Sequence, residues 1–188
     1  PGKYLAFLGR VSPEKCPDQA IELAKRVGIP MKMAAKVDPA DRAYFERVVE
    51  PLLDHPLIEF VGEITDAEKS DFIGNAIGLI CPYDWPEPFG LVLIESLACG
   101  TPVLAYRRGS IPEIIGHGVT GFISENLDEM VSQVDKLGTI DRNRCRQVFD
   151  ERFTAQRMTT DYVKIYQQLI TDAAALPGKS GQQHASNL

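Results

Sequence analysis

Two carboxylates stand eight positions apart in the stretch DWPEPFGLVLIE, residues 84–95. Glu87 lies between Pro86 and Pro88. Because proline fixes its own φ and keeps the preceding residue out of the helical region, we expect Glu87 to be presented from a stiff, extended loop. Glu95 lies in the apolar run that follows. A carboxylate there could accept hydrogen bonds from a vicinal diol such as a ribose.

The start of that apolar run offers backbone donors for an anion. We expect a helix to begin at Phe89, Gly90 and Leu91, where amide N–H groups have no intrahelical partner and the helix dipole attracts a phosphate. Gly90 would let a ligand approach the backbone closely. Glu95, roughly 6 Å along the helix axis from Leu91, would reach the same ligand.

Two cations in another loop could neutralise a diphosphate. Arg10 and Lys15 lie in GRVSPEK, residues 9–15, on a turn shaped by glycine and proline. Each feature also has a simpler explanation: acids near a helix start compensate its dipole, cations beside a helix are solvated, and Trp85 caps the core. Dipole compensation requires neither prolines around the first acid nor cations in an opposite loop. The combination therefore favours a binding site.

The elements that must hold these groups alternate along the chain. Apolar runs bounded by turn residues predict strands at 4–8, 31–35, 57–61, 77–81, 102–105 and 122–123. Amphipathic segments predict helices at 17–27, 39–53, 66–75, 91–99, 111–115, 127–137, 143–149 and 155–170. Near-continuous apolar strands require a sheet covered on both faces, so we predict an α/β fold with a Rossmann-like, doubly wound parallel sheet of about six strands. In the usual order 3-2-1-4-5-6, the loops after strands one and four face each other.

Composition and charge argue against several classes of function. The net charge of −6, from 20 basic and 26 acidic side chains in 188 residues, argues against a general nucleic-acid or anionic-membrane surface. Cys16, Cys81, Cys99 and Cys145 form no C-x-x-C pair, so we expect no zinc site but reduced, packing thiols in a cytoplasmic protein. No apolar stretch approaches the ~20 residues of a membrane span. Residues 176–188 are almost free of apolar side chains, which predicts a disordered tail.

Several motifs together resemble one enzyme family. The cations after the first strand, EPFGLVLIE, SLACGTPVLAY, GSIPEII and GVTGF are similar, in this order, to the donor-binding half of retaining GT-B glycosyltransferases of the sucrose-synthase-like, glycosyl transferases group 1 family. The resemblance covers most of residues 5–169. It implies that residues 1–175 form the C-terminal GT-B domain of a hexosyltransferase. The donor would be a nucleotide-diphosphate sugar, a UDP-sugar being the commonest. The N-terminal acceptor-binding domain would be absent, leaving this chain inactive alone.

The resemblance also implies a role for each candidate residue. Glu87 would be the catalytic residue, beside the donor sugar, where it supports the charge developing at the anomeric centre. Glu95 would bind the ribose hydroxyls. The diphosphate would be bound by Arg10, Lys15, Phe89, Gly90 and Leu91, and the base would lie near Glu63 and Ile64. The reaction would retain configuration, and peripheral membrane contact would be made only through the missing domain.

The family implies no metal or other cofactor, and the sequence agrees because no D-x-D occurs. The nearest acidic pair is Asp66 and Glu68, and Thr65 with Glu68 is typical of a capping box that opens a helix. Neither G-x-G-x-x-G nor G-x-x-x-x-G-K-[ST] is present. Ser110 departs from the family, since many relatives have a second glycine there. The arginine pair at 107–108 is not a general family feature, and we expect an exposed turn.

Two other kinds of function remain open at this point. A sugar-phosphate enzyme, such as a phosphorylase or an epimerase, could use the same scaffold, although no Schiff-base lysine for a pyridoxal-type phosphorylase stands out. A non-catalytic nucleotide-sugar binding domain would bind a donor and transfer nothing. The sequence names neither the sugar, nor the base, nor the acceptor.

Overall fold

The computed structural model describes residues 2–175, so the tail predicted at 176–188 lies outside the described residues. The chain divides into two compact units, Pro1–Glu151 and Arg152–Leu188. The first contains a six-stranded sheet in the order β3-β2-β1-β4-β5-β6, and every strand pairing is parallel. The strands are β1 (Leu5–Arg10), β2 (Met31–Lys36), β3 (Ile58–Gly62), β4 (Gly78–Cys81), β5 (Val103–Tyr106) and β6 (Gly121–Ser124). The predicted fold class and strand order are both confirmed.

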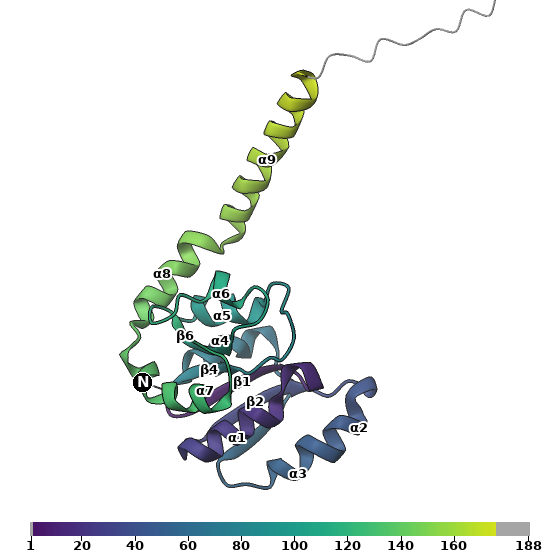
Figure 1. Ribbon diagram of the computed structural model, residues 1–188, viewed down its shortest axis with the longest axis vertical. Helices are drawn as coiled ribbons and strands as arrows, with labels where there is room; N and C mark the ends of the chain where they lie inside the picture. The colour runs from purple at the N-terminus through teal and green to yellow at the C-terminus, as the bar shows by residue number, and fades with distance from the viewer. Residues whose placement is uncertain (1, 176–188) are drawn as a thin grey trace, which may run out of the picture. The chain divides into compact units, whose positions relative to one another are not determined.

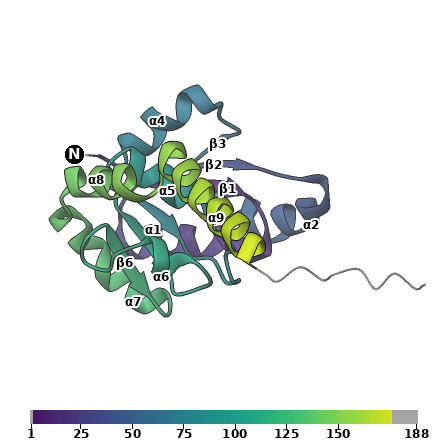
Figure 2. The same cartoon turned by 90° about the horizontal axis from the view of Figure 1, so that it is seen from above.

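Helices cover both faces of this sheet. They are α1 (Pro17–Val27), α2 (Arg42–Tyr44), α3 (Glu50–Leu53), α4 (Asp66–Gly74), α5 (Leu91–Ala98), α6 (Ile111–Ile114), α7 (Leu127–Gln133) and α8 (Arg142–Arg152). In Figure 1, α1, α3 and α7 lie along one face, and α4 and α5 lie along the other, as Figure 2 also shows for α1, α7, α4 and α5. An ion pair between Arg26 and Asp128, 2.8 Å, joins α1 to α7. The sheet is thus buried between two helical layers.

The strand side chains form the core. Leu5 and Phe7 of β1, Met31 and Met33 of β2, and Leu79 and Ile80 of β4 are fully buried. Burial of both faces explains why these strands read as continuous apolar runs instead of alternating ones. Because the strands are parallel, their carboxyl ends lie along one edge of the sheet. The loops to the helices begin there.

The sequence predictions for the end of β1 and for the helix at 39–53 are wrong. Strand β1 continues to Arg10, which therefore ends a strand instead of lying on a turn. The single helix predicted at 39–53 is interrupted: a 3₁₀ turn at Pro39–Asp41 precedes α2, and a π-helical turn at Phe45–Val49 separates α2 from α3. Pro51, at the start of α3, accounts for the π turn, because its ring has no N–H and clashes with the carbonyl one turn earlier.

Helix starts and ends follow local chemistry. The capping box at Thr65 and Glu68 is confirmed: the Thr65 N–H donates to Glu68 Oε2 at 2.8 Å and opens α4. Asn126 caps α7 by accepting from the Glu129 N–H. The helix predicted at 127–137 ends early, because the chain tightens into a 3₁₀ helix at Val134–Thr139. Helix α8 is longer than the predicted 143–149.

The second unit contains α9 (Ala155–Ala175), 21 residues long. Tyr162 and Tyr166 lie one turn apart with ring centroids separated by 6.1 Å. Met158, Tyr162, Ile165 and Leu169 recur at three- and four-residue spacing, so these side chains share one face of the helix. Among residues 2–175, no helix is both long and apolar enough to cross a bilayer.

Candidate functional site

The loops that follow β1 and β4 meet, as the strand order predicts. The Asp84 N–H donates to the carbonyl oxygen of Glu14 at 3.0 Å, which joins the two loops through their backbones. The first loop contains a 3₁₀ turn at Pro13–Lys15, and α1 follows it. Two segments distant in sequence are therefore held together at the carboxyl edge of the sheet, where ligands of such folds bind.

Glu87 is buried at this junction and is paired with Lys15. The Lys15 ammonium donates to Glu87 Oε2, and the Trp85 Nε1–H donates to the same oxygen at 3.0 Å. The Glu87 residue is only 6% exposed. Lys15 Nζ also lies 4.0 Å from the ring centroid of Tyr83 and 5.2 Å from that of Trp85, so the ammonium is enclosed by aromatic faces and a carboxylate.

Two side chains near this pair, Tyr83 and Cys81, remain uncharged. Burial raises the pKa of the Tyr83 hydroxyl well above its ordinary value. Burial likewise raises the pKa of the Cys81 thiol, to about 12. Both side chains therefore keep their protons at neutral pH, and the charge on Lys15 is balanced locally by Glu87. All four cysteines are free, as expected.

A neighbouring turn fixes the backbone of Glu87. The Ser110 N–H donates to the Glu87 carbonyl oxygen at 2.8 Å. Gly109 has φ +54°, and a Cβ placed there would overlap the Glu87 carbonyl oxygen. Sequence reasoning noted Ser110 but missed Gly109, whose signal is the glycine of RRGSIPE. Pro86 and Pro88 stiffen the loop, and this turn determines where it lies.

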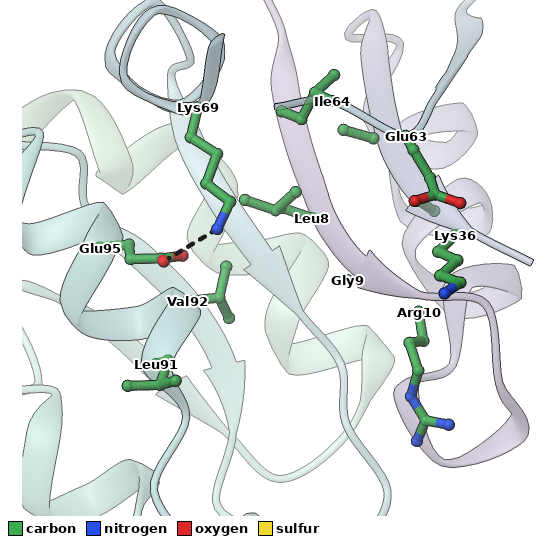
Figure 3. A pocket seen from close by; sticks show the side chains of 12 residues that line it. Leu8, Gly9, Arg10, Lys36, Glu63, Ile64, Lys69, Leu91, Val92 and Glu95 are labelled. Carbon is green, nitrogen blue, oxygen red and sulfur yellow. Dashed lines mark hydrogen bonds and ion pairs between the residues drawn. The ribbon is translucent and has the colours of Figure 1, made fainter. Parts of the chain in front are cut away.

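An open cavity of about 350 Å³ lies at the same edge of the sheet (Figure 3). Its lining comes from the ends of β1 and β2, the loop after β3, and helices α4 and α5: Leu8, Gly9, Arg10, Ala34, Ala35, Lys36, Glu63, Ile64, Lys69, Leu91, Val92 and Glu95. Five predicted site residues, Arg10, Glu63, Ile64, Leu91 and Glu95, are among them. The structure thus brings together groups that the sequence had placed in three separate segments.

Glu95 has a cationic partner that sequence reasoning missed. Lys69 Nζ donates to Glu95 Oε1 at 3.2 Å, and the same ammonium contacts Asp66 Oδ1 at 2.9 Å. Figure 3 shows Lys69 reaching from α4 across to Glu95 on α5. The hydrogen bond to Asp66, with that to Glu95, raises the pKa of Lys69. The partner could not be found from spacing, because it depends on how α4 packs beside α5.

Arg10 and Lys15 do not share a partner. The Arg10 guanidinium contacts Glu14 at 2.9 Å, Asp38 at 3.8 Å and Asp41 at 3.9 Å, and about half of its side chain is exposed. Arg10 therefore lines the cavity, and nearby carboxylates balance its charge. The expectation that the two cations act together on one diphosphate stays a prediction.

The start of α5 requires glycine for internal reasons, and the approach of a ligand to Gly90 stays a prediction. Gly90 is the N-cap with φ +78°, and a Cβ there would lie 2.7 Å from Leu93 Cδ1. Phe89 and Leu91, on either side, are 46% and 66% exposed. Only glycine fits both the backbone angle and the space, and the first amides of α5 begin beside Glu87.

The arginine pair at 107–108 is engaged in ion pairs. Arg107 contacts Glu125 at 2.7 Å, and Arg108 contacts Asp84 at 3.3 Å. Arg108 thus ties the turn after β5 to the loop that contains Glu87. Across the described residues 2–175, no cluster of three or more His, Cys, Asp or Glu side chains could hold a metal ion.

The arrangement can bind an anion and a diol side by side. A partly buried ammonium, a buried carboxylate and a helix start meet at one position, and a second carboxylate lines the adjoining cavity. A helix N-terminus and an ammonium both attract phosphate. A carboxylate accepts hydrogen bonds from hydroxyl groups.

The sequence of this chain is similar to those of known proteins. The family model described as "Glycosyl transferases group 1" matches residues 1–148. N-acetyl-alpha-D-glucosaminyl L-malate synthase of Bacillus anthracis is 37% identical over 94 residues, which cover 46% of this chain and 25% of that enzyme. D-inositol 3-phosphate glycosyltransferase of Mycobacterium marinum is 29% identical over 140 residues, which cover 72% of this chain and 30% of the relative.

Solved structures share the fold. HepE of Anabaena, crystallised in complex with UDP and glucose, superposes with a TM-score of 0.73 at 20% identity, covering 93% of this chain and 49% of that one. Sucrose-phosphate synthase of Thermosynechococcus elongatus gives a TM-score of 0.76 at 21% identity, covering 90% and 46%. The chain thus spans about a quarter to a third of the two curated relatives and about half of these solved proteins.

Proposed function

This chain belongs to the glycosyl transferases group 1 family, and we propose that it is the donor-binding half of a retaining glycosyltransferase that uses a nucleotide-diphosphate sugar. The family membership and the Rossmann-like GT-B fold are the premise. The donor, the stereochemistry and the residue roles are the proposal. The acceptor would be bound by a further domain, because GT-B enzymes place the reaction between two such domains.

One observation supports this function most strongly. Arg10, Glu63, Ile64, Leu91 and Glu95 line a single cavity, and the loop that ends at α5 connects that cavity to the Lys15–Glu87 pair. A ribose and base in the cavity would direct a diphosphate toward the start of α5. The sugar would then lie beside Glu87.

The side chains suit the chemistry of glycosyl transfer. Departure of a diphosphate leaves positive charge at the anomeric carbon, which a fixed carboxylate stabilises most when it is shielded from water. Glu87 is buried and oriented by two donors, Lys15 and Trp85. In the donor complex, Lys15 would move part of its interaction to the departing diphosphate. Release of Lys15 would leave the Glu87 carboxylate free to face the sugar.

The relatives indicate the kind of donor. HepE has been crystallised with UDP and glucose, and the named relatives of Bacillus and Mycobacterium are enzymes of sugar transfer. We therefore propose a UDP-sugar first, with GDP- and ADP-sugars as the alternatives. Retention of configuration, independence from metal and other cofactors, and a cytoplasmic location are parts of the same proposal.

Calorimetric titration tests the donor site. The 188-residue chain would be titrated in EDTA with UDP, GDP and ADP and with their glucose, mannose and N-acetylglucosamine forms. We expect saturable binding by one nucleotide family, lost in Lys15→Met and kept in Lys136→Met, an exposed lysine outside this site. Thermal unfolding of each variant confirms that it is folded. A folded chain that binds no nucleotide at millimolar concentration would contradict the donor site.

The role of Glu87 needs the protein with its acceptor domain. Glu87→Gln keeps the shape of the side chain and removes its charge. We expect transfer to be lost while nucleotide affinity changes little. Transfer that persists in Glu87→Gln would remove the catalytic role from this residue.

A further inference from the structure

We propose that Lys69 positions the carboxylate of Glu95 for a ribose diol and balances its charge, which makes Lys69 a determinant of nucleotide binding. The inference rests on the proposed function. It assigns a role to a side chain that the sequence motifs did not mark, on a helix outside the loops that contain Lys15 and Glu87.

Lys69 is held from two sides at the wall of the cavity. It lies on the first turn of α4, where its ammonium contacts Asp66 Oδ1 at 2.9 Å, and it donates to Glu95 Oε1 at 3.2 Å (Figure 3). The Lys69 side chain is 30% exposed and that of Glu95 is 38% exposed. Both ends of the bridge are therefore accessible to a ligand in the cavity.

The bridge orients the acceptor that a diol would use. Lys69 engages Oε1 of Glu95, and in the described part of the chain no hydrogen bond reaches Oε2. A carboxylate fixed at one oxygen loses less freedom when hydroxyl groups bind the other, because its orientation is already set. Without Lys69, the Glu95 side chain would have to be ordered by the ligand itself.

The negative charge of Glu95 is the second reason for assigning this role to Lys69. A nucleoside diphosphate is strongly anionic, and an unpaired carboxylate in the same cavity would repel it. Asp66 and Glu95 both raise the pKa of Lys69, with Asp66 contributing more, so its amine stays protonated at neutral pH. Glu95 can then accept hydrogen bonds without adding its full negative charge to the site.

Lys69 lines two cavities, which determines the choice of variant. The second, of about 320 Å³, is lined by Lys69 and Glu95 together with Ser70, Ile73 and Cys99, among others. Truncation to alanine would enlarge both cavities and confuse the result. Lys69→Met keeps the aliphatic stem and removes the ammonium.

The experiment compares ligands with and without the diol. The 188-residue chain and its variants Lys69→Met, Lys69→Arg and Lys136→Met would be titrated calorimetrically with UDP and with 2′,3′-dideoxy-UDP, or with the GDP or ADP pair if the unmodified chain selects that base. Because a hydrogen bond to a charged group is lost, we expect Lys69→Met to weaken UDP by about tenfold. It should weaken the dideoxy ligand clearly less, since that ligand is still repelled by the unbalanced Glu95 charge but has no hydroxyls to lose from Glu95. Lys69→Arg should restore UDP binding to within about threefold, and Lys136→Met should match the unmodified chain.

Each other outcome has a definite meaning. If the unmodified chain binds UDP and Lys69→Met binds it equally well, Lys69 has no such role and the donor site survives. If Lys69→Met weakens both ligands equally, Lys69 acts as a general cation and does not position Glu95 for the diol. If the unmodified chain binds no nucleotide, the proposed function is overturned and the role of Lys69 with it.

Discussion

The ammonium of Lys15 and the carboxylate of Glu87 form a largely buried ion pair between residues 72 positions apart. Their side chains are only 15% and 8% exposed, and the Trp85 N–H donates to the same Glu87 oxygen. The pair links the loop after β1 to the loop after β4 through side chains, in addition to the backbone bond between Asp84 and Glu14. A proposed catalytic carboxylate is therefore also part of what holds the site together.

Removal of one partner should destabilise the fold. Lys15→Met or Glu87→Gln leaves an uncompensated buried group, which costs about 3–5 kcal/mol in comparable pairs. The double variant should lose less than the sum of the single losses, because neither charge is left alone. Urea unfolding measures all three free energies. Asp150→Asn, which breaks the exposed pair with Arg146, is the control and should change little; strictly additive losses would show that the buried pair is not coupled.

Gly109→Ala should displace the Glu87 loop. A Cβ at Gly109, where φ is +54°, would overlap the Glu87 carbonyl oxygen. Gly28 also has positive φ, +69°, but faces open space. Gly28→Ala should therefore cost only the backbone strain of about 1–2 kcal/mol. Gly109→Ala should cost clearly more in urea unfolding and should weaken nucleotide binding, and equal costs would show that the contact with Glu87 is unimportant.

Trp85 should report on the diphosphate. It is the one tryptophan of the chain, and the Lys15 ammonium lies 5.2 Å from its ring centroid. If a diphosphate draws Lys15 away, Trp85 emission should change saturably with UDP and remain unchanged with uridine, which has no phosphate. In Lys15→Met the response should disappear. An equal response to uridine would mean that Trp85 senses the nucleoside and not the diphosphate.

Stability should fall at alkaline pH. Burial raises the pKa of Cys81 and of Tyr106 to about 12 and that of Cys145 to about 11, from ordinary values of 9.0 for cysteine and 10.0 for tyrosine. Above pH ~9 the unfolded chain thus binds fewer protons than the folded chain, so the free energy of unfolding decreases as pH rises. Each group contributes a slope of up to about 1.4 kcal/mol per pH unit. That stability is complete below pH ~9 and is lost as pH rises through the folded pKa values.

Urea unfolding between pH 7 and 11, in the presence of a reductant, checks the slope. At pH 7 the free energy of unfolding of Cys81→Ala should be lower than that of the unmodified chain, because a buried side chain is lost. Its decrease at alkaline pH should be shallower. The curves would run parallel if Cys81 titrated equally in both states. That result would contradict the raised pKa.

The sequence by itself determined the α/β class, the order of the six strands and the meeting of the loops after β1 and β4. Apolar runs, capping residues and prolines act within a few residues of one another, and the handedness of parallel connections restricts how such elements assemble. The same local reasoning placed Glu87 in a stiff loop and Gly90 at the start of α5. It failed at Pro51, where the preceding helix widens into a π turn.

Only the tertiary structure decided which side chains meet. Lys15 pairs with Glu87, whereas Arg10, from the same stretch of sequence, pairs with Glu14, Asp38 and Asp41. Lys69 reaches Glu95 because α4 and α5 lie on the same face of the sheet. Such contacts depend on helix packing, rotamers and the space between distant segments, such as the space that Gly109 leaves for the Glu87 backbone. Sequence periodicity specifies the face on which a residue lies, and packing in three dimensions selects its partner.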